Sequence, residues 1–331
     1  MMRFFLILYL LFCNSLLVFS QQDLKVYEDY MPESKCGEVI NYTHYSVSYC
    51  EKYKLSEWSI HYMTEERVFG DVDRTDNFRL DNKGRGASLS NYYKSGYDRG
   101  HMVPAGDMKF NQTAMNESFF LTNISPQNPS FNRGINKKIE SKFREWVVFD
   151  FDTIIIITGF VMDEDLFNGF IGPDRIPIPS YSYKIFIDKI NHRSLAFLVP
   201  MNKKIKGRMF DYIISIDELE TIADIDFFEK MPLEEEILYE MDTNMDFDPE
   251  SNLKGSMVEP SDFKKNNKKT AVPENGKKKV ISPVDYNNYS KKYHCLEKNQ
   301  DGIPCPRHTK GPNEKCWEHS KQNNIRDNEI E

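Results

Sequence analysis

The residues best suited to chemistry stand in the stretch YDRGHMVPAGDM, where Asp98, Arg99 and His101 lie within four positions of one another. Pro104 and Gly106 interrupt helices and strands, so we expect this group to lie in or beside a loop. An imidazole titrates near neutral pH and can take a proton from water. A neighbouring guanidinium can neutralise negative charge that grows on a phosphoryl group. The structural alternative is a polar surface turn in which Asp98 pairs with Arg99.

A second polar group follows in FNRGINKKIESKFRE, where Asn132 precedes a predicted helix that contains Glu140 and Arg144. Positions four apart share one face of a helix. A hard cation such as Mg²⁺ prefers oxygen ligands and keeps several waters, so one or two protein oxygens suffice to hold it. The two groups together are what metal-assisted phosphodiester cleavage needs, although the residues alone also fit other metal hydrolases. The structural alternatives are a helix cap at Asn132 and a surface ion pair between Glu140 and Arg144.

Four residues near the C-terminus have the types and spacing of a zinc site. Three thiolates and one imidazole can close a tetrahedral Zn²⁺ site, and the glycines and prolines between them let the chain bend around it. His308 is an alternative fourth ligand, and a disulfide between two of the cysteines is the alternative to zinc. The predicted zinc ligands are Cys295, Cys305, Cys316 and His319.

The elements that must position the first two groups are predicted to form one α+β domain over residues 23–240. Turn residues separate the last two β-type runs, which predicts a hairpin. Helical periodicity is clearest over 135–146 and 232–241. The β-type runs are 144–161, 183–190 and 194–201.

The ends of the chain differ from this domain in composition. Residues 1–20 are apolar with one early cation, Arg3, which predicts a secretory signal peptide cleaved near Ser20 and no membrane contact afterwards. A retained membrane anchor is the alternative. Residues 241–287 are rich in lysine and asparagine and predict a basic, flexible linker, followed by a small Cys/His module over 288–331.

Charge and cysteine content add two expectations. A net charge of −8 argues against a nucleic-acid partner, but the acids gather over 216–250 and the lysines over 264–280. The total therefore says little about any one face. Cys36 and Cys50 bracket a short segment and suit a disulfide in an oxidising compartment.

The chain resembles the DNA/RNA non-specific endonuclease family over roughly residues 53–240. The blocks that carry the resemblance are NFRLD, YDRGHMVPAGDM, FFLTNISPQ, FNRGINKKIE, TGFV, IPIPSYSYKIFID, AFLVP and SIDELETIADIDFF. The resemblance implies a ββα-metal (His-Me finger) fold with a central antiparallel sheet. It also implies a general base at His101, a metal-binding amide at Asn132 and a glutamate that holds metal-bound water at Glu140. The remaining implied site residues are Asp98 and Arg99 of the motif, the phosphate-facing Arg144, and Asn123 in a supporting position at the metal.

We therefore predict a secreted, sugar-non-specific endonuclease that uses Mg²⁺ or Mn²⁺ on DNA and RNA and leaves 5′-phosphate ends. The alternatives are an inactive nucleic-acid-binding protein of the same fold and a partner-binding protein centred on the C-terminal module. A homodimer stays open. Two positions depart from the family pattern: Asn136 stands where an aromatic residue is common, and Asp76 stands where some members have arginine. Arg74 and Arg79 are the nearby candidates for the phosphate contact that this arginine would make.

Overall fold

The computed structural model describes residues 23–201 and 207–240. The predicted signal peptide (1–20), linker (241–287) and C-terminal module (288–331) lie outside the described residues, and so do the four predicted zinc ligands. The linker, the C-terminal module, the zinc ligands and the domain boundaries stay predictions. No helix among the described residues is long and apolar enough to span a membrane.

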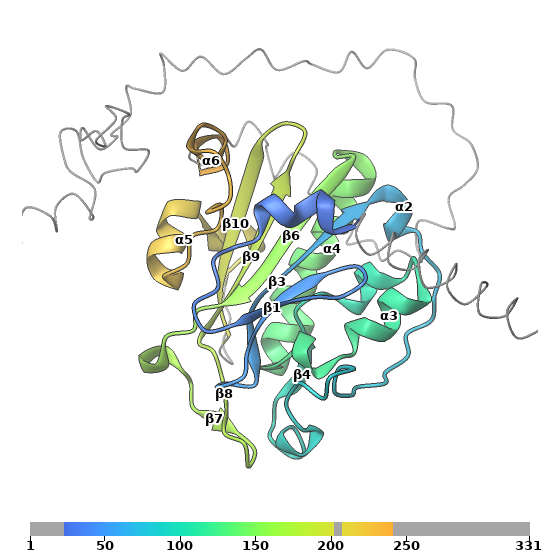
Figure 1. Cartoon of the computed structure of the whole chain (residues 1–331), viewed down its shortest axis with the longest axis vertical. Coiled ribbons are helices and arrows are strands. Elements are labelled where there is room, and N and C mark those ends of the chain that lie inside the picture. Colours follow the sequence, from blue (N-terminus) through green and yellow to red (C-terminus); the bar gives the residue numbers. More distant parts are fainter. Residues whose placement is uncertain (1–22, 202–206, 241–331) are drawn as a thin grey trace, which may run out of the picture. The chain divides into compact units, whose positions relative to one another are not determined.

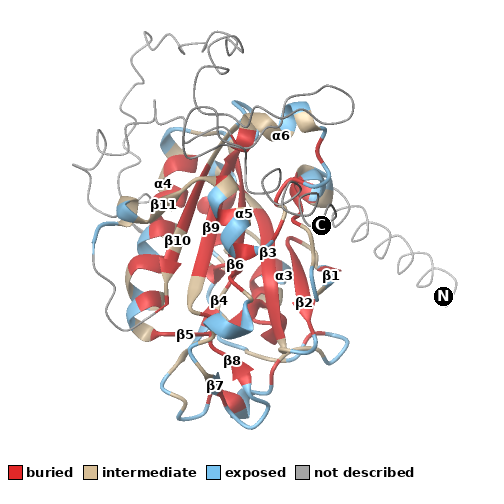
Figure 2. Cartoon of the chain, turned by 90° about the vertical axis from the view of Figure 1, so that its left-hand side faces the viewer, coloured by how far each residue is buried: buried red, intermediate tan, exposed pale blue. Residues whose placement is uncertain are grey.

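A seven-stranded antiparallel sheet forms the centre of the described fold, in the order β1-β2-β3-β6-β9-β10-β11 (Figure 1). Its inner strands are buried along most of their length (Figure 2). The strands are β1 (Glu38–Asn41), β2 (Ser46–Cys50), β3 (Leu55–Thr64), β6 (Thr153–Phe160), β9 (Tyr181–Asp188), β10 (Arg193–Pro200) and β11 (Ile213–Ile214).

Both faces of this sheet are covered by other elements. Successive side chains of a strand point to opposite sides, so one strand contributes to the hydrophobic cluster on each face. In β6, Ile155 and Ile157 pack in one hydrophobic cluster, whereas Ile154 and Ile156 pack in another. The first cluster includes buried residues of helices α5 (Ile216–Ala223) and α6 (Leu233–Glu240). The second includes helix α4 (Lys137–Phe149), which lies on the other side of the sheet (Figure 1).

Helix α4 confirms the predicted helical periodicity and corrects one predicted strand. Ile139, Phe143 and Trp146 recur at helical spacing and are all buried against the sheet. The β-type run predicted from residue 144 is wrong over its first part, because residues 144–149 belong to α4 and the strand begins at Thr153. A continuous apolar run does not distinguish a buried strand from a buried helix face.

The predicted hairpin is confirmed as β9 and β10, which pair from Arg193↔Asp188 to Pro200↔Tyr181. The predicted disulfide is also present and joins Cys36 to Cys50, with the Cα atoms 5.3 Å apart. The strands β1 to β3 were not predicted from the sequence. Buried serines interrupt their apolar pattern, among them Ser46, Ser48 and Ser59.

A smaller two-stranded sheet stands apart from the central one and carries the DRGH motif. It consists of β4 (Asp98–His101) and β5 (Ile124–Gln127), which pair antiparallel. The remaining elements are α2 (Glu65–Val68), α3 (Gln112–Ser118), β7 (Phe170–Ile171), β8 (Ile176–Pro177), the 3₁₀ turns η1 (Glu28–Tyr30), η2 (Leu89–Asn91), η3 (Ala105–Met108), η4 (Leu121–Asn123), η6 (Glu164–Leu166) and η7 (Met209–Tyr212), and the π-turn η5 (Phe131–Asn136).

Candidate active site

Strands β4 and β5, followed in the chain by η5 and α4, form a ββα unit. Asp98 pairs with Gln127 in the register, and His101 pairs with Ile124 at the other end of β4. Gly100 has no room for a side chain, because a Cβ there would lie 2.1 Å from the Gln127 Cδ. The glycine of the motif thus lets the Gln127 side chain cross β4 next to His101.

The His101 ring sits among aromatic side chains. It packs edge-on to Phe119 with centroids 4.8 Å apart, and it lies 5.4 Å from the Phe78 ring. Its Nε2 is buried and has no hydrogen-bond partner among the described residues. Burial, followed by the positive charges of Arg74 and Arg99, lowers the pKa of His101 to about 3. The imidazole is therefore neutral at pH 7.

Asp98 holds the amide of Asn132 at the start of η5. The Asn132 Nδ2 donates to Asp98 Oδ2 at 2.9 Å, and Arg133 donates to both carboxylate oxygens at 2.8 and 2.5 Å. Burial favours a higher pKa for Asp98, but the hydrogen bonds from Arg133 and Asn132 outweigh it and the pKa is lowered. Because its Nδ2 is used by Asp98, Asn132 presents its Oδ1 as the atom available to a cation.

Glu140 lies one helical turn into α4 and contacts cations from two elements. Its Oε1 accepts from Asn136 Nδ2 at 2.9 Å and lies 3.7 Å from the Lys184 Nζ, and its Oε2 lies 3.9 Å from Arg144. Burial raises the pKa of Glu140, although Lys184 and Arg144 oppose the shift. Asn136, which departs from the family pattern, thus supplies a hydrogen bond to this carboxylate.

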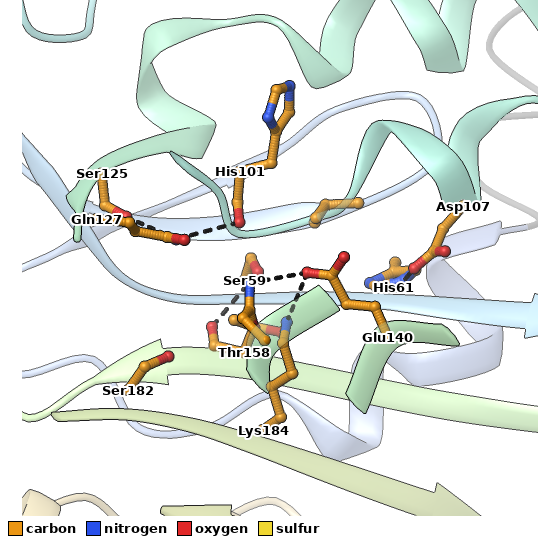
Figure 3. A network of polar contacts seen from close by, with 12 residues as sticks. Ser59, His61, His101, Asp107, Ser125, Gln127, Glu140, Thr158, Ser182 and Lys184 are labelled. Carbon is orange, nitrogen blue, oxygen red and sulfur yellow. Dashed lines mark hydrogen bonds and ion pairs between the residues drawn. The ribbon is translucent and has the colours of Figure 1, made fainter. Parts of the chain in front are cut away.

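Lys184 reaches Glu140 from the central sheet. It belongs to a row of polar residues across three strands, in which Ser59 of β3 pairs with Thr158 of β6 and Thr158 pairs with Lys184 of β9. The Lys184 Nζ donates to the Thr158 Oγ1 at 3.0 Å. Figure 3 shows Glu140, Lys184 and Thr158 directed toward one another between α4 and the sheet.

Arg144 is turned inward, so the expectation that it faces a phosphate is not met. Its Nε donates to Asp107 Oδ1 at 2.6 Å, and only 6% of its side chain is exposed. The other Asp107 oxygen lies 3.1 Å from the Nε2 of His61, which is fully buried. A Cβ on Gly106 would come within 2.6 Å of the Arg144 guanidinium. A desolvated guanidinium needs a counter-charge, and Asp107 supplies it.

The buried residues His61, Asp107, Arg144 and Lys184, together with the partly buried Glu140, are called the buried polar layer below. Burial favours a higher pKa for Asp107, but Arg144 and His61 outweigh it and the pKa is lowered. Burial lowers the pKa of both His61 and Lys184. The layer thus combines two carboxyl groups, Asp107 and Glu140, and two basic side chains, Arg144 and Lys184, with the neutral imidazole of His61.

Asn123 does not present its amide to a metal. The buried side chain accepts from Val103 N at 2.9 Å and donates to the carbonyls of Val103 and Ser118 at 3.0 and 2.8 Å. These bonds to the backbone use both ends of the amide. Asn123 therefore fixes the chain that follows His101, and the expectation of a position at the metal is not met.

A cleft of about 650 Å³ opens beside the ββα unit. Asp98, Arg99 and Asn132 line it, as does Phe78, which contacts the His101 ring. Arg74 also lines the cleft, whereas Arg79 is not among the lining residues and donates to the carbonyls of Asn77 and Asn116. Of the two arginines left open by the sequence, Arg74 is the one on the cleft.

Three residues of the buried polar layer were missed by sequence reasoning: His61, Asp107 and Lys184. A weak signal existed for two of them. Asp107 stands at the end of the quoted motif, and Lys184 is a single cation inside the otherwise apolar strand YKIFID. No sequence signal indicated His61, because its partner comes from a loop distant in the chain.

The site fits a hard divalent cation by its chemistry. The Asn132 Oδ1 and the Glu140 carboxylate are oxygen donors, which such ions prefer. The Asn132 amide is held from behind by the Asp98 carboxylate, as outer-shell groups hold metal ligands in other proteins. A ββα unit that combines a neutral histidine with such donors, packed on a large antiparallel sheet, defines the ββα-metal nuclease fold.

The comparisons with known proteins agree. The family model for DNA/RNA non-specific endonuclease matches residues 22–234, and the chain belongs to this family. It is 30% identical over 214 residues to the mitochondrial nuclease EXOG of Mus musculus, a match that covers 59% of this chain and 58% of that protein. It is also 30% identical over 202 residues to the mitochondrial nuclease of Saccharomyces cerevisiae, covering 53% of this chain and 60% of that protein. The chain thus spans less than two thirds of the length of these relatives.

A solved structure of EndoG in complex with EndoGI shares the fold. Its TM-score is 0.57 at 23% identity, and the match covers 63% of this chain and 92% of that chain.

The expectation of secretion is wrong in light of these relatives. The proteins named above from mouse and yeast are mitochondrial nucleases, and so are similar proteins from Homo sapiens and Schizosaccharomyces pombe. These names point to mitochondria rather than to the extracellular space. The prediction rested on the apolar character of residues 1–20. Hydropathy alone is a weak guide to the compartment of a protein, because targeting signals are read by receptors.

Proposed function

We propose that this protein is a nuclease that hydrolyses phosphodiester bonds of DNA and RNA with little sequence preference. The observation that carries the proposal is the ββα unit, which places the Asp98–Asn132 pair on a cationic cleft and packs His101 against Phe78, one of the residues that line this cleft. Contacts to phosphate and metal rather than to base edges give no means of reading sequence. The names of the relatives support a mitochondrial compartment for this activity.

His101 serves as the general base in this proposal. Its neutral imidazole takes a proton from a water molecule, the water oxygen attacks phosphorus, and the bond from phosphorus to the 3′-oxygen breaks. The 3′-oxygen leaves and gains a proton from solvent, so the products are a 3′-hydroxyl and a 5′-phosphate. Arg99 and Arg74 line the cleft and neutralise negative charge on the non-bridging oxygens.

Asn132 and Glu140 would hold a divalent cation, Mg²⁺ or Mn²⁺, with most of its waters retained. Such an ion supplies Lewis-acid stabilisation of the charge on the phosphoryl and leaving oxygens. Asp98 orients the Asn132 amide for this task, and Lys184 and Asn136 orient the Glu140 carboxylate.

The experiment that tests the proposal incubates the purified protein with supercoiled plasmid, single-stranded DNA and RNA. Each substrate is offered with Mg²⁺, with Mn²⁺ and with EDTA, beside the variant His101→Ala. Cleavage that requires the metal and falls by about 10²–10⁴-fold in the variant supports the nuclease and its base. Binding without cleavage under every metal condition supports the inactive binding protein instead. A homodimer stays a prediction, which sedimentation velocity on the same sample tests.

A further inference from the structure

The segment just before the DRGH motif places an aromatic ring and a cation on the open side of the cleft. Tyr93 is 75% exposed, and Lys94 lies over its ring at 5.2 Å from the centroid. Both residues line the cleft together with Asp98 and Asn132. Tyr93 therefore presents a solvated ring at the lining of the cleft, beside the candidate active site.

This segment is fixed at both sides of Tyr93. On one side, Asn91 donates to Asp174 Oδ2 at 2.7 Å and accepts from the Asp174 backbone N–H at 2.9 Å. The next residue, Tyr92, is buried and donates to the Ile124 carbonyl of β5 at 3.4 Å. On the other side, the Ser95 backbone N–H donates to the Tyr92 carbonyl at 3.2 Å in a turn that leads into β4 at Asp98. Tyr93 is therefore presented by a held backbone that is tied directly to the ββα unit.

The cleft is positively charged although the whole chain carries −8. Its two lining carboxylates already pair with arginines, Asp76 with Arg74 and Asp98 with Arg133. The two remaining cations, Lys94 and Arg99, lie over aromatic rings. A groove of cations with exposed aromatic rings is the combination that binds single-stranded nucleic acid, in which rings stack on bases and cations follow the backbone.

We propose that Tyr93 and Lys94 form a stacking subsite for one unpaired nucleobase of the substrate strand whose phosphate lies at Arg99 and Asn132. The inference rests on the proposed function in one respect: the nuclease activity makes the bound strand the substrate. A base inside a duplex is covered by its neighbours and cannot stack on Tyr93. The subsite therefore strengthens binding to single strands and to frayed or flipped positions, and not to intact duplex.

The test measures binding by fluorescence anisotropy in EDTA, where the proposed chemistry does not proceed. The probes are a short labelled single strand, the same strand in a duplex, and a single strand of the same length built from abasic nucleotides. The variants are Tyr93→Ala, Tyr93→Phe and the control Phe149→Ala, which removes a ring that is 66% exposed on α4 and does not line the cleft.

We expect Tyr93→Ala to weaken single-strand binding between about 5-fold and about 150-fold, the range measured for one stacked base. Tyr93→Phe and Phe149→Ala should bind as the wild type does. The duplex and the abasic strand should show no effect of Tyr93→Ala, because neither offers a free base. An equal loss on single strand and duplex, or a loss that persists on the abasic strand, overturns the subsite.

The cleavage assay separates this inference from the proposed function. If the protein cleaves with a metal but Tyr93→Ala binds single strands as well as the wild type does, the nuclease is supported and the subsite is overturned. Tyr93-dependent binding of single strands by a protein that cuts nothing with any divalent cation upholds the subsite and overturns the nuclease.

Discussion

The buried polar layer and the cleft differ in how their charged side chains are placed. In the layer, Lys184 and Arg144 are 3% and 6% exposed, and each has a carboxylate as its partner. In the cleft, Arg99 and Lys94 are exposed to solvent and lie over rings. A buried charge must be paired at all times, whereas a solvated charge is available to a substrate. Glu140 is common to both arguments, because its partners Asn136, Arg144 and Lys184 are buried and it is also a proposed ligand of the metal.

The largest expected effect comes from breaking the buried polar layer. Lys184→Met should lower the free energy of unfolding by about 3–5 kcal/mol, because Glu140 is left as a buried charge without its sheet partner. Chemical denaturation measures the change, and Lys138→Met, an exposed lysine on the same helix as Glu140, is the matched control. The double variant Lys184→Met with Glu140→Gln should recover much of the loss. A double variant as unstable as the single one would show that packing, not charge pairing, explains the effect.

Crowding at the motif glycine should have the next largest effect. Gly100→Ala places a Cβ against the Gln127 side chain and should cost about 1–3 kcal/mol of stability, with a loss of cleavage as β4 shifts. Thermal unfolding and plasmid nicking measure the two consequences. Adding Gln127→Ala makes room for the new methyl group, so the double variant should be the more stable of the two. The opposite order would place the conflict elsewhere in the backbone.

Acidification should destabilise the folded state through His101. Its pKa is about 3 when folded and about 6.5 when unfolded. The unfolded state therefore binds the extra proton first, and stability present above pH 6.5 is lost as the pH falls toward 3. Between pH 7 and pH 5 the loss should be at most about 2 kcal/mol, and smaller in His101→Asn. The exposed His192→Asn serves as control, and an unchanged pH slope in His101→Asn would refute the assignment.

The smallest expected effect separates the two arginines near the NFRLD block. Arg74→Gln should lower the cleavage rate by about tenfold, equivalent to about 1.4 kcal/mol, because Arg74 lines the cleft near the His101 ring. Arg79→Gln should leave the rate near that of the wild type, since its guanidinium donates to backbone carbonyls. Initial rates on one RNA and one DNA substrate measure both. A larger loss in Arg79→Gln than in Arg74→Gln would place the phosphate contact at Arg79 instead.

The sequence by itself determined the family, the DRGH motif, the hairpin of β9 and β10, and the helix that carries Glu140. These features depend on local order: residue types at fixed spacing, apolar period, and turn chemistry between runs. The sequence also indicated the Cys36–Cys50 disulfide, since the two cysteines bracket one short segment.

Only the tertiary structure decided which charges are buried and what they contact. Arg144 turns to Asp107, and Lys184 reaches Glu140, because pairing of β3, β6 and β9 sets the polar row beneath α4. Asn123 hydrogen-bonds to the backbone of Val103, because the fold brings these two segments together. The partner of a buried polar group comes from elements distant in the chain, and its choice follows from strand register and helix packing rather than from local sequence.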